Sequence, residues 1–242
     1  MVDQTTRAVL RQPRDPRGGR PLVGASILSA DFANLERECR GVLRAGADLL
    51  HLDVMDGHFV PNLTMGPDVC RCLRRALPDA AIDVHLMVER PGEYIEPFAE
   101  AGADHLTFHA EAAGGDAAGL IGRIGDAGLT AGVAVNPDTP VEFGLEQLGD
   151  ASLALVMSVH PGFSGQAFLQ EVLPKAAELA SRCDEGVRIE IDGGINPRTA
   201  ALAREHGVDV LVAASSIFGL PERERAARIA ALRGVAGAGE SG

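Results

Sequence analysis

Three short segments place side chains that can bind a metal or move a proton at the ends of predicted strands. His51 and Asp53 alternate with aliphatic residues in the first, Asp83 and His85 do so in the second, and Asp192 ends the third, directly before two glycines. Side chains two residues apart on a strand share a face, so each segment would have one apolar and one polar face. Two imidazoles and two carboxylates suit a divalent ion such as Zn, Fe, Mn or Co. One such histidine alone would more often be structural, but the three segments together predict a site for one divalent metal ion, with ligands His51, Asp53, His85 and Asp192.

Three loops rich in glycine and serine could hold an anionic group. They are residues 162–165, 193–194 and 214–216, and each follows a segment predicted to be a strand. Glycine lets the backbone approach a phosphate closely, and backbone N–H groups can then donate hydrogen bonds to it. Any one of these loops could be only a tight turn. Three of them favour a phosphate site, provided that the fold brings them to the same edge.

The elements that must position these residues alternate between strand and helix. Strands are predicted at 23–28, 50–55, 82–87, 105–108, 131–135, 153–159, 189–192 and 208–213, and helices begin near 31, 67, 91, 116, 140, 168, 197 and 221. Such alternation indicates a parallel sheet, and eight units favour the α/β class with a single (β/α)8 TIM barrel, whose chemistry lies at the carboxyl ends of the strands. The alternative is an open doubly wound sheet. The first strand is not followed by G-x-G-x-x-G, which argues against a dinucleotide-binding version of that fold.

The composition fits one soluble domain. The chain has 242 residues, close to the roughly 250 of a typical barrel, with 46% hydrophobic and 23% charged residues and a formal net charge of −12. This charge argues against a nucleic-acid partner, and no apolar run approaches the roughly 20 residues of a membrane span. The four cysteines, Cys39, Cys70, Cys72 and Cys183, form no C-x-x-C pair. We therefore expect free thiols and a cytoplasmic protein.

Both ends of the chain are expected to lie outside the barrel. Residues 1–21 form an Arg-rich segment without apolar periodicity, interpreted as a solvated and disordered tail, and residues 236–242 form a loose, Gly-rich tail. The barrel is expected to occupy residues 22–235. Arg188 and Glu190 should point into its lower end, where the simplest interpretation is an internal ion pair.

Several motifs resemble those of a known family. They are residues 26–32 (SILSADF), 51–62 (HLDVMDGHFVPN), 83–87 (DVHLM), 156–163 (VMSVxPGF, leaving out position 160) and 192–196 (DGGIN). These segments resemble the ribulose-phosphate 3-epimerase family, and the resemblance covers about residues 22–218. It implies a (β/α)8 barrel with one divalent metal ion that interconverts D-ribulose 5-phosphate and D-xylulose 5-phosphate in the pentose phosphate pathway.

The resemblance also implies roles for particular residues. Asp53 and Asp192 would be the two catalytic acid/bases as well as metal ligands, beside His51 and His85. The substrate would contact Ser26, Met55, His85, Met87, Met157, Gly162, Phe163, Ser164, Gly165, Gly193, Gly194, Ala214 and Ser215. The expected partner is thus a small sugar phosphate, and a homo-oligomer is expected.

The chain departs from the family pattern at four positions. Ala25 stands where proline is usual, His160 where asparagine is usual, and Ser164 and Ala214 where glycine is usual. These changes leave the metal set intact and bear on the phosphate loops. Two alternatives share the same residues. One is a 3-epimerase of a ketohexose 6-phosphate such as allulose 6-phosphate. The other is a non-catalytic sugar-phosphate sensor, against which the pair of carboxylates argues, because binding alone needs no bases.

Overall fold

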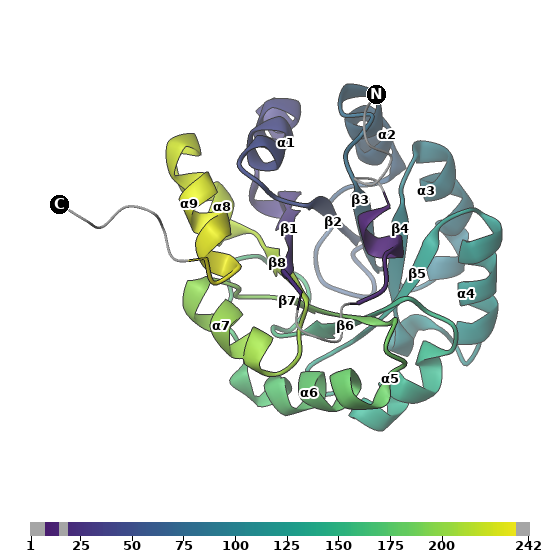
Figure 1. The fold of residues 1–242 in the computed structure, drawn as a ribbon. Coiled ribbons are helices and arrows are strands. Elements are labelled where there is room, and N and C mark those ends of the chain that lie inside the picture. Colours follow the sequence, from purple (N-terminus) through teal and green to yellow (C-terminus); the bar gives the residue numbers. More distant parts are fainter. Residues whose placement is uncertain (1–7, 15–18, 236–242) are drawn as a thin grey trace.

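Eight parallel strands close into a barrel (Figure 1), in a computed structural model that describes residues 8–14 and 19–235. The strands are β1 Leu22–Ser26, β2 Leu49–Met55, β3 Ile82–Met87, β4 His105–His109, β5 Thr130–Val135, β6 Leu153–Met157, β7 Arg188–Asp192 and β8 Val210–Ala213. Neighbours in sequence pair in space, and β1 also pairs with β8, which closes the ring. The predicted (β/α)8 barrel is confirmed, and an open sheet is excluded.

Helices surround the strands on the outside of the barrel (Figure 1). They are α1 Leu35–Arg44, α2 Pro67–Ala76, α3 Ile95–Ala101, α4 Ala117–Asp126, α5 Val141–Leu148, α6 Leu173–Arg182, α7 Pro197–Glu205, the short α8 Ser215–Phe218 and α9 Glu222–Leu232. Six short 3-10 helices lie in the described residues: η1 Val9–Arg11, η2 Ile27–Ser29, η3 Phe32–Asn34, η4 Pro91–Glu93, η5 Ala110–Ala112 and η6 Gln170–Val172. Within the described ranges, no helix has the length and apolar character needed to cross a membrane.

Two strands end earlier than the sequence predicts. The first was expected to reach residue 28, but β1 ends at Ser26 and η2 follows. The sixth was expected to reach residue 159, but β6 ends at Met157. Ile27 and Val159 are nevertheless buried. The apolar run therefore continues into the loops above the barrel, and hydrophobicity alone cannot mark the end of the strand.

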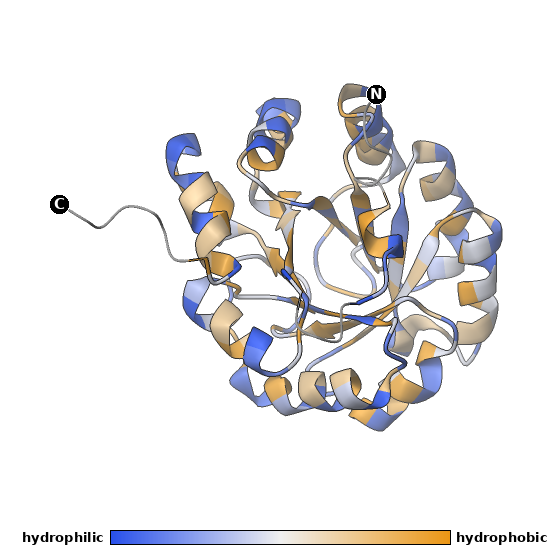
Figure 2. Cartoon of the chain, in the orientation of Figure 1, coloured by the Kyte–Doolittle hydropathy of each residue, from blue (hydrophilic) through white to orange (hydrophobic). Residues whose placement is uncertain are grey.

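The core has two main parts, besides a small cluster of Met55, Val60 and Met87. The larger one lies between the outer faces of the strands and the inward faces of the helices, where Leu52, Val84 and Phe98 are fully buried. Figure 2 shows the apolar colour on the strands and on the helix sides that face them. Burying each such side chain contributes about 1.5–3 kcal/mol. The smaller part fills the lower interior of the barrel with side chains such as Leu49, Leu153 and Val210.

The segment before β1 is not a solvated tail throughout, so that expectation is wrong for residues 8–14. Leu10, in η1, is only 5% exposed and packs with Leu22, Leu49 and Leu153 in the lower interior. Arg11 donates a hydrogen bond to the carbonyl of Gly128, two residues before β5. One buried leucine gives no periodicity to detect, and its partners come together only when the barrel closes. Residues 1–7, 15–18 and 236–242 lie outside the described ranges.

The predicted ion pair between Arg188 and Glu190 is also wrong. Arg188 Nη1 lies 3.6 Å from Asp209 Oδ2, and its Nε donates to the carbonyl of Gln12 at 3.0 Å. Glu190 points toward the metal-site residues instead, with Oε1 3.9 Å from His51 Nδ1. Side chains two apart on β7 share a face, but Arg188 reaches the lower rim while Glu190 stays inside.

Candidate metal centre and active site

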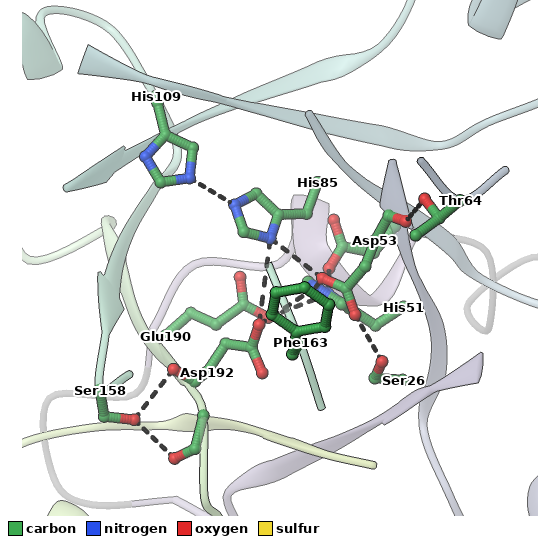
Figure 3. A network of polar contacts seen from close by, with 12 residues as sticks. Ser26, His51, Asp53, Thr64, His85, His109, Ser158, Phe163, Glu190 and Asp192 are labelled. Atoms are coloured by element: carbon green, nitrogen blue, oxygen red, sulfur yellow. Dashed lines mark hydrogen bonds and ion pairs between the residues drawn. The ribbon is translucent and has the colours of Figure 1, made fainter. Parts of the chain in front are cut away.

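Strand register brings the predicted ligands together. In the pairing of β2 with β3, His51 lies opposite Asp83 and Asp53 lies opposite His85. Each imidazole therefore has a carboxylate as its direct neighbour on the adjacent strand. Asp192, at the end of β7, approaches the same point from across the barrel interior (Figure 3).

Four donor atoms converge at this point. Asp53 Oδ1 lies 3.3 Å from His51 Nε2 and 3.2 Å from His85 Nδ1. Asp192 Oδ2 lies 4.0 Å from His51 Nε2 and 3.9 Å from His85 Nδ1. The four atoms all lie within 4.8 Å of one another. Ligands about 2.1 Å from one tetrahedral ion stand roughly 3.4 Å apart, so the set is close to the spacing that a single ion requires.

The hydrogen bonding of His51 indicates which kind of ligand fits between the four donor atoms. Its Nδ1–H donates to Asp83 Oδ2 at 2.6 Å, because an ionised carboxylate can only accept. The Nε2 lone pair then faces the oxygens of Asp53 and Asp192, and this buried nitrogen has no hydrogen-bond partner among the described residues. A lone pair against carboxylate oxygens is repulsive, so either a proton on Nε2 or a bound cation must lie between them. Metal-binding histidines commonly donate their other N–H to a carboxylate, so the residues fit a divalent ion.

The two catalytic candidates have environments that separate their acidities. Burial, together with the charge of Asp53, raises the pKa of Asp192 to about 7. Burial acts in the same direction on Asp53, but the charge and hydrogen bonds of His51 and His85 more than offset it and hold the pKa of Asp53 below its usual range. Two neighbouring carboxylates with pKa values pushed apart are the pattern of an acid and a base.

The two imidazoles also differ. Burial lowers the pKa of His85 to about 4, so this ring is neutral at physiological pH. Burial opposes a charge on His51 as well, but the carboxylates of Asp83 and Asp53 raise its pKa well above the usual value. The interior at His51 therefore attracts positive charge. Behind it, burial and the charge of Asp83 raise the pKa of Glu190.

A cavity of about 250 Å³ opens above these groups at the carboxyl ends of the strands. The predicted substrate residues that line it are Ser26, Met55, Met87, Met157, Gly162, Phe163, Ser164, Gly165, Gly193, Gly194, Ala214 and Ser215. His85 does not line it, because the ring is fully buried below Asp53 and Asp192. Ser216, in the third predicted anion loop, also lines it, and seven further lining residues were not predicted: Leu28, Val159, Pro161, Gln166, Ile195, Asn196 and Val212. All three predicted anion loops thus meet on one cavity.

The loop after β7 requires its two glycines. Gly193 has φ +119° and Gly194 has φ +61°. A Cβ on Gly193 would lie 2.6 Å from Val159 Cγ2, and one on Gly194 would lie 2.7 Å from the backbone N of Phe168. The hydroxyl of Ser158 donates to the carbonyls of Asp192 and Gly193 at 2.9 and 2.7 Å, which fixes this turn to the end of β6 (Figure 3).

Two departures from the family pattern are sterically harmless. Ala214 has φ −108°, and no residue other than glycine has a positive φ within the described ranges, Ser164 included. Neither position needs the conformational freedom of glycine. Ala25 is buried within β1, and His160 is exposed at the rim.

Sequence reasoning missed the residues that support the ligands. Asp83 was visible in its motif but could be assigned to His51 only from the register of β2 and β3. His109 ends β4 and contacts His85, and Glu111 lies in η5 and contacts His109. A histidine at the end of another strand was the signal, but nothing in its spacing pointed to His85.

The site as a whole is a cavity at the carboxyl ends of the barrel strands, lined by two carboxylates and three Gly- and Ser-containing loops, above donor atoms that could hold a metal ion. Residues 22–218 match the model of the ribulose-phosphate 3 epimerase family. The chain belongs to this family and is an isomerase.

Individual relatives agree with this assignment. The chain is 47% identical over 216 residues to ribulose-phosphate 3-epimerase of Bacillus subtilis, which covers 88% of this chain and 98% of the relative. It is 46% identical over 203 residues to the cytoplasmic isoform of Oryza sativa, covering 83% and 88%. A crystal structure of 3-hexulose-6-phosphate synthase superposes with a TM-score of 0.68 over 88% of this chain and 99% of that one. At 18% identity, that likeness concerns the fold alone.

Proposed function

We propose that this protein interconverts D-ribulose 5-phosphate and D-xylulose 5-phosphate by removing and returning the proton at C3. The observation that carries the proposal is the pair Asp53 and Asp192. They come from β2 and β7, line one cavity and have pKa values shifted in opposite directions. Epimerisation needs a base on one face of the carbon and an acid on the other, each worth roughly 10²–10⁴-fold in rate.

A divalent ion, Zn, Fe, Mn or Co, would be held by the four converging donors. When bound, such an ion supplies Lewis acidity that makes the carbon next to the ketone easier to deprotonate. The second oxygen of Asp53 is oriented by Ser26, whose Oγ donates to Oδ2 at 2.5 Å. Asp53 therefore has one oxygen toward the histidines and one fixed toward β1, so its direction of approach to the substrate is set before binding.

Proton transfer then runs between the two carboxylates through the substrate. One carboxylate takes the C3 proton, which leaves an enediolate, and the other delivers a proton to the opposite face. The reverse reaction exchanges these roles. Met55, Met87 and Met157 give this part of the cavity an uncharged, polarizable lining, and apolar walls keep water from competing for the enediolate.

The phosphate of the substrate is proposed to lie at the other end of the cavity, against the loops after β6, β7 and β8. The first turn of a helix leaves N–H groups without intrahelical acceptors, and α8 begins at Ser215 on this wall. The loop residues are uncharged, so the backbone would supply most donors. We also propose a cytoplasmic location, which the name of the rice relative and the four free thiols support.

The deciding experiment is an assay of the purified protein with ribulose 5-phosphate and with allulose 6-phosphate, before and after chelation. We expect efficient, chelator-sensitive turnover of the pentose phosphate. Efficient turnover of only the hexose phosphate would assign the alternative epimerase. Binding of either without turnover would indicate a sensor, and full activity in protein shown to be metal-free would refute the role of the ion.

A further inference from the structure

A chain of three side chains leads from the metal site toward the rim of the barrel. His85 Nε2 lies 2.8 Å from His109 Nε2, and His109 Nδ1 lies 3.3 Å from Glu111 Oε2. The two rings are fully buried, with centroids 5.0 Å apart and planes 22° from parallel (Figure 3 shows the pair). Phe59 packs on His109, with ring centroids 4.8 Å apart. Neither His109 nor Glu111 lines the cavity.

Glu111 ends this chain as an acceptor. Its Oε1 accepts from the backbone N–H of Asn136 at 2.8 Å and from the hydroxyl of Thr139. Burial opposes ionisation, but the hydrogen bonds from His109, Thr139 and Asn136 lower the pKa of Glu111 to about 2. The side chain is therefore a carboxylate at physiological pH, and a carboxylate only accepts hydrogen bonds.

The direction of every bond in the chain follows from this end. Because the carboxylate of Glu111 can only accept, the nitrogen of His109 that faces it, Nδ1, must carry a proton. A neutral His109 then has a bare Nε2, which can only accept, so His85 must carry its proton on Nε2. The remaining nitrogen of His85, Nδ1, is left with its lone pair toward Asp53 and Asp192. We propose that Glu111 is a positioning residue that acts through His109 to fix His85 in the tautomer that can bind a metal; this rests on the proposed metal site.

The opposite tautomer of His85, with its proton on Nδ1, would also find a hydrogen-bond acceptor. The chain of Glu111 and His109, called the relay below, is therefore needed to select the tautomer that can bind a metal. Nδ1 of His85 lies 3.2 Å from Asp53 Oδ1, so a proton on Nδ1 would have a ready acceptor there and would block the metal. His51 is held in its binding tautomer by direct contact with Asp83. His85 Nε2 contacts His109 instead of a carboxylate. The carboxylate of Glu111 therefore sets the tautomer of His85 indirectly, through the two hydrogen bonds of His109.

Substitution of Glu111 separates this role from simple anchoring of the loop. In Glu111→Gln, the amide oxygen is needed by the N–H of Asn136, so the NH2 group faces His109 Nδ1 and reverses both bonds. In Glu111→Ala, a water can enter and accept from His109, because water serves as donor or acceptor. The isosteric Gln variant should therefore lose more metal affinity than the Ala variant. If Glu111 only anchors the loop, Ala should be the more harmful change.

The measurement is Zn²⁺ affinity of the purified full chain by competition with a chromophoric chelator. Loss of an outer partner of a metal ligand typically weakens affinity 10–100-fold. We expect about that loss for Glu111→Gln, a smaller one for Glu111→Ala, and a change within about twofold for Thr139→Val. The last is a matched control, since it removes another hydrogen bond to the same carboxylate without touching His109. Equal affinities for Gln and wild type, or a greater loss for Ala, would overturn the proposal.

Ring nitrogen NMR gives a second readout that does not need metal. Protein labelled with ¹⁵N should show neutral His109 with its proton on Nδ1 and His85 with its proton on Nε2, and Glu111→Gln should reverse both. A cationic His109, or a proton on His85 Nδ1 in the wild type, would refute the relay. If the wild type shows the expected tautomers but does not bind Zn²⁺ or other divalent ions, the metal site fails while the relay stands.

Discussion

The two ends of the barrel bury charge in different ways. At the amino end, Arg188 and Arg14 flank Asp209 at 3.6 and 3.7 Å, and Leu10 fills the interior between the strands. At the carboxyl end, two carboxylates and two imidazoles face one another, and no lysine or arginine of the described residues is among them. Unlike charges are brought together at the lower end, and acidic groups are crowded at the upper end. The lower end should therefore contribute stability through its apolar packing, while the upper end keeps donor groups that could hold a cation and exchange protons.

The strongest test of this contrast substitutes the two carboxylates at the upper end. Asn is nearly isosteric with Asp but cannot act as a base at neutral pH. Asp53→Asn and Asp192→Asn should each reduce net epimerisation by roughly 10²-fold or more, with little loss of melting temperature. Each variant should still exchange the C3 proton of one epimer with deuterated water, and the two variants should retain opposite epimers.

Metal content must be measured beside the exchange, because a lost ion would imitate a lost base. Two metal-loaded variants that exchange the same epimer would contradict the assignment of two bases. Near-normal turnover in either would do so as well.

At the lower end, the largest expected effect is on stability. Leu10→Ala removes a buried side chain from the interior of the barrel, and such changes cost about 2–5 kcal/mol. We expect about 2 kcal/mol by chemical denaturation, because Leu10 is the one buried residue of a short 3-10 helix, and an unchanged kcat. Val9→Ala, at a half-buried position of the same turn, is the matched control and should cost less. A normal unfolding curve for Leu10→Ala would restore the view of the segment as a solvated tail.

The two ends of the barrel also differ in how much of each could be predicted from the sequence. The eight strands and the four candidate ligands could be predicted, because alternation along one strand is a local pattern and Asp192 is marked by the glycines after it. The pairing of Asp83 with His51 depends on the register between two strands. A local pattern cannot supply that register, and the same holds for His109 against His85.

The lower end depends even more on closure of the barrel. Arg188 and Glu190 are two residues apart, so an ion pair between them was the simplest prediction. In the structure Arg188 contacts Asp209, which precedes β8, and the carbonyl of Gln12. Three segments far apart in sequence meet there only after β8 has paired with β1. Leu10 could not be predicted as a core residue for the same reason, because the residues it packs against come from different strands.

A third, smaller effect concerns pH at the lower end. Burial raises the pKa of Asp209 to about 6 from 3.8, although Arg188 and Arg14 oppose it. The folded state therefore holds this proton more tightly than the unfolded state, so this group makes stability fall as pH rises from about 4 to 6. The difference in unfolding free energy between wild type and Asp209→Asn should change by about 1–3 kcal/mol across that range. A difference that is constant with pH would show that Asp209 is already ionised at pH 4.

The smallest expected effect is at the phosphate end of the cavity. Ser215 is exposed at the start of α8 and lines the cavity beside the loops after β6 and β7. If backbone N–H groups supply most of the phosphate contacts, its hydroxyl adds one hydrogen bond, worth about 0.5–1.5 kcal/mol. Ser215→Ala should then raise KM about two- to tenfold and change kcat less. Ala214→Gly is the control, because Ala214 has φ −108° and gains nothing from glycine, so its KM should stay within about twofold. A loss in kcat alone for Ser215→Ala would place this loop at the reacting carbons, and the upper end would then have its chemistry spread across the cavity instead of concentrated at Asp53 and Asp192.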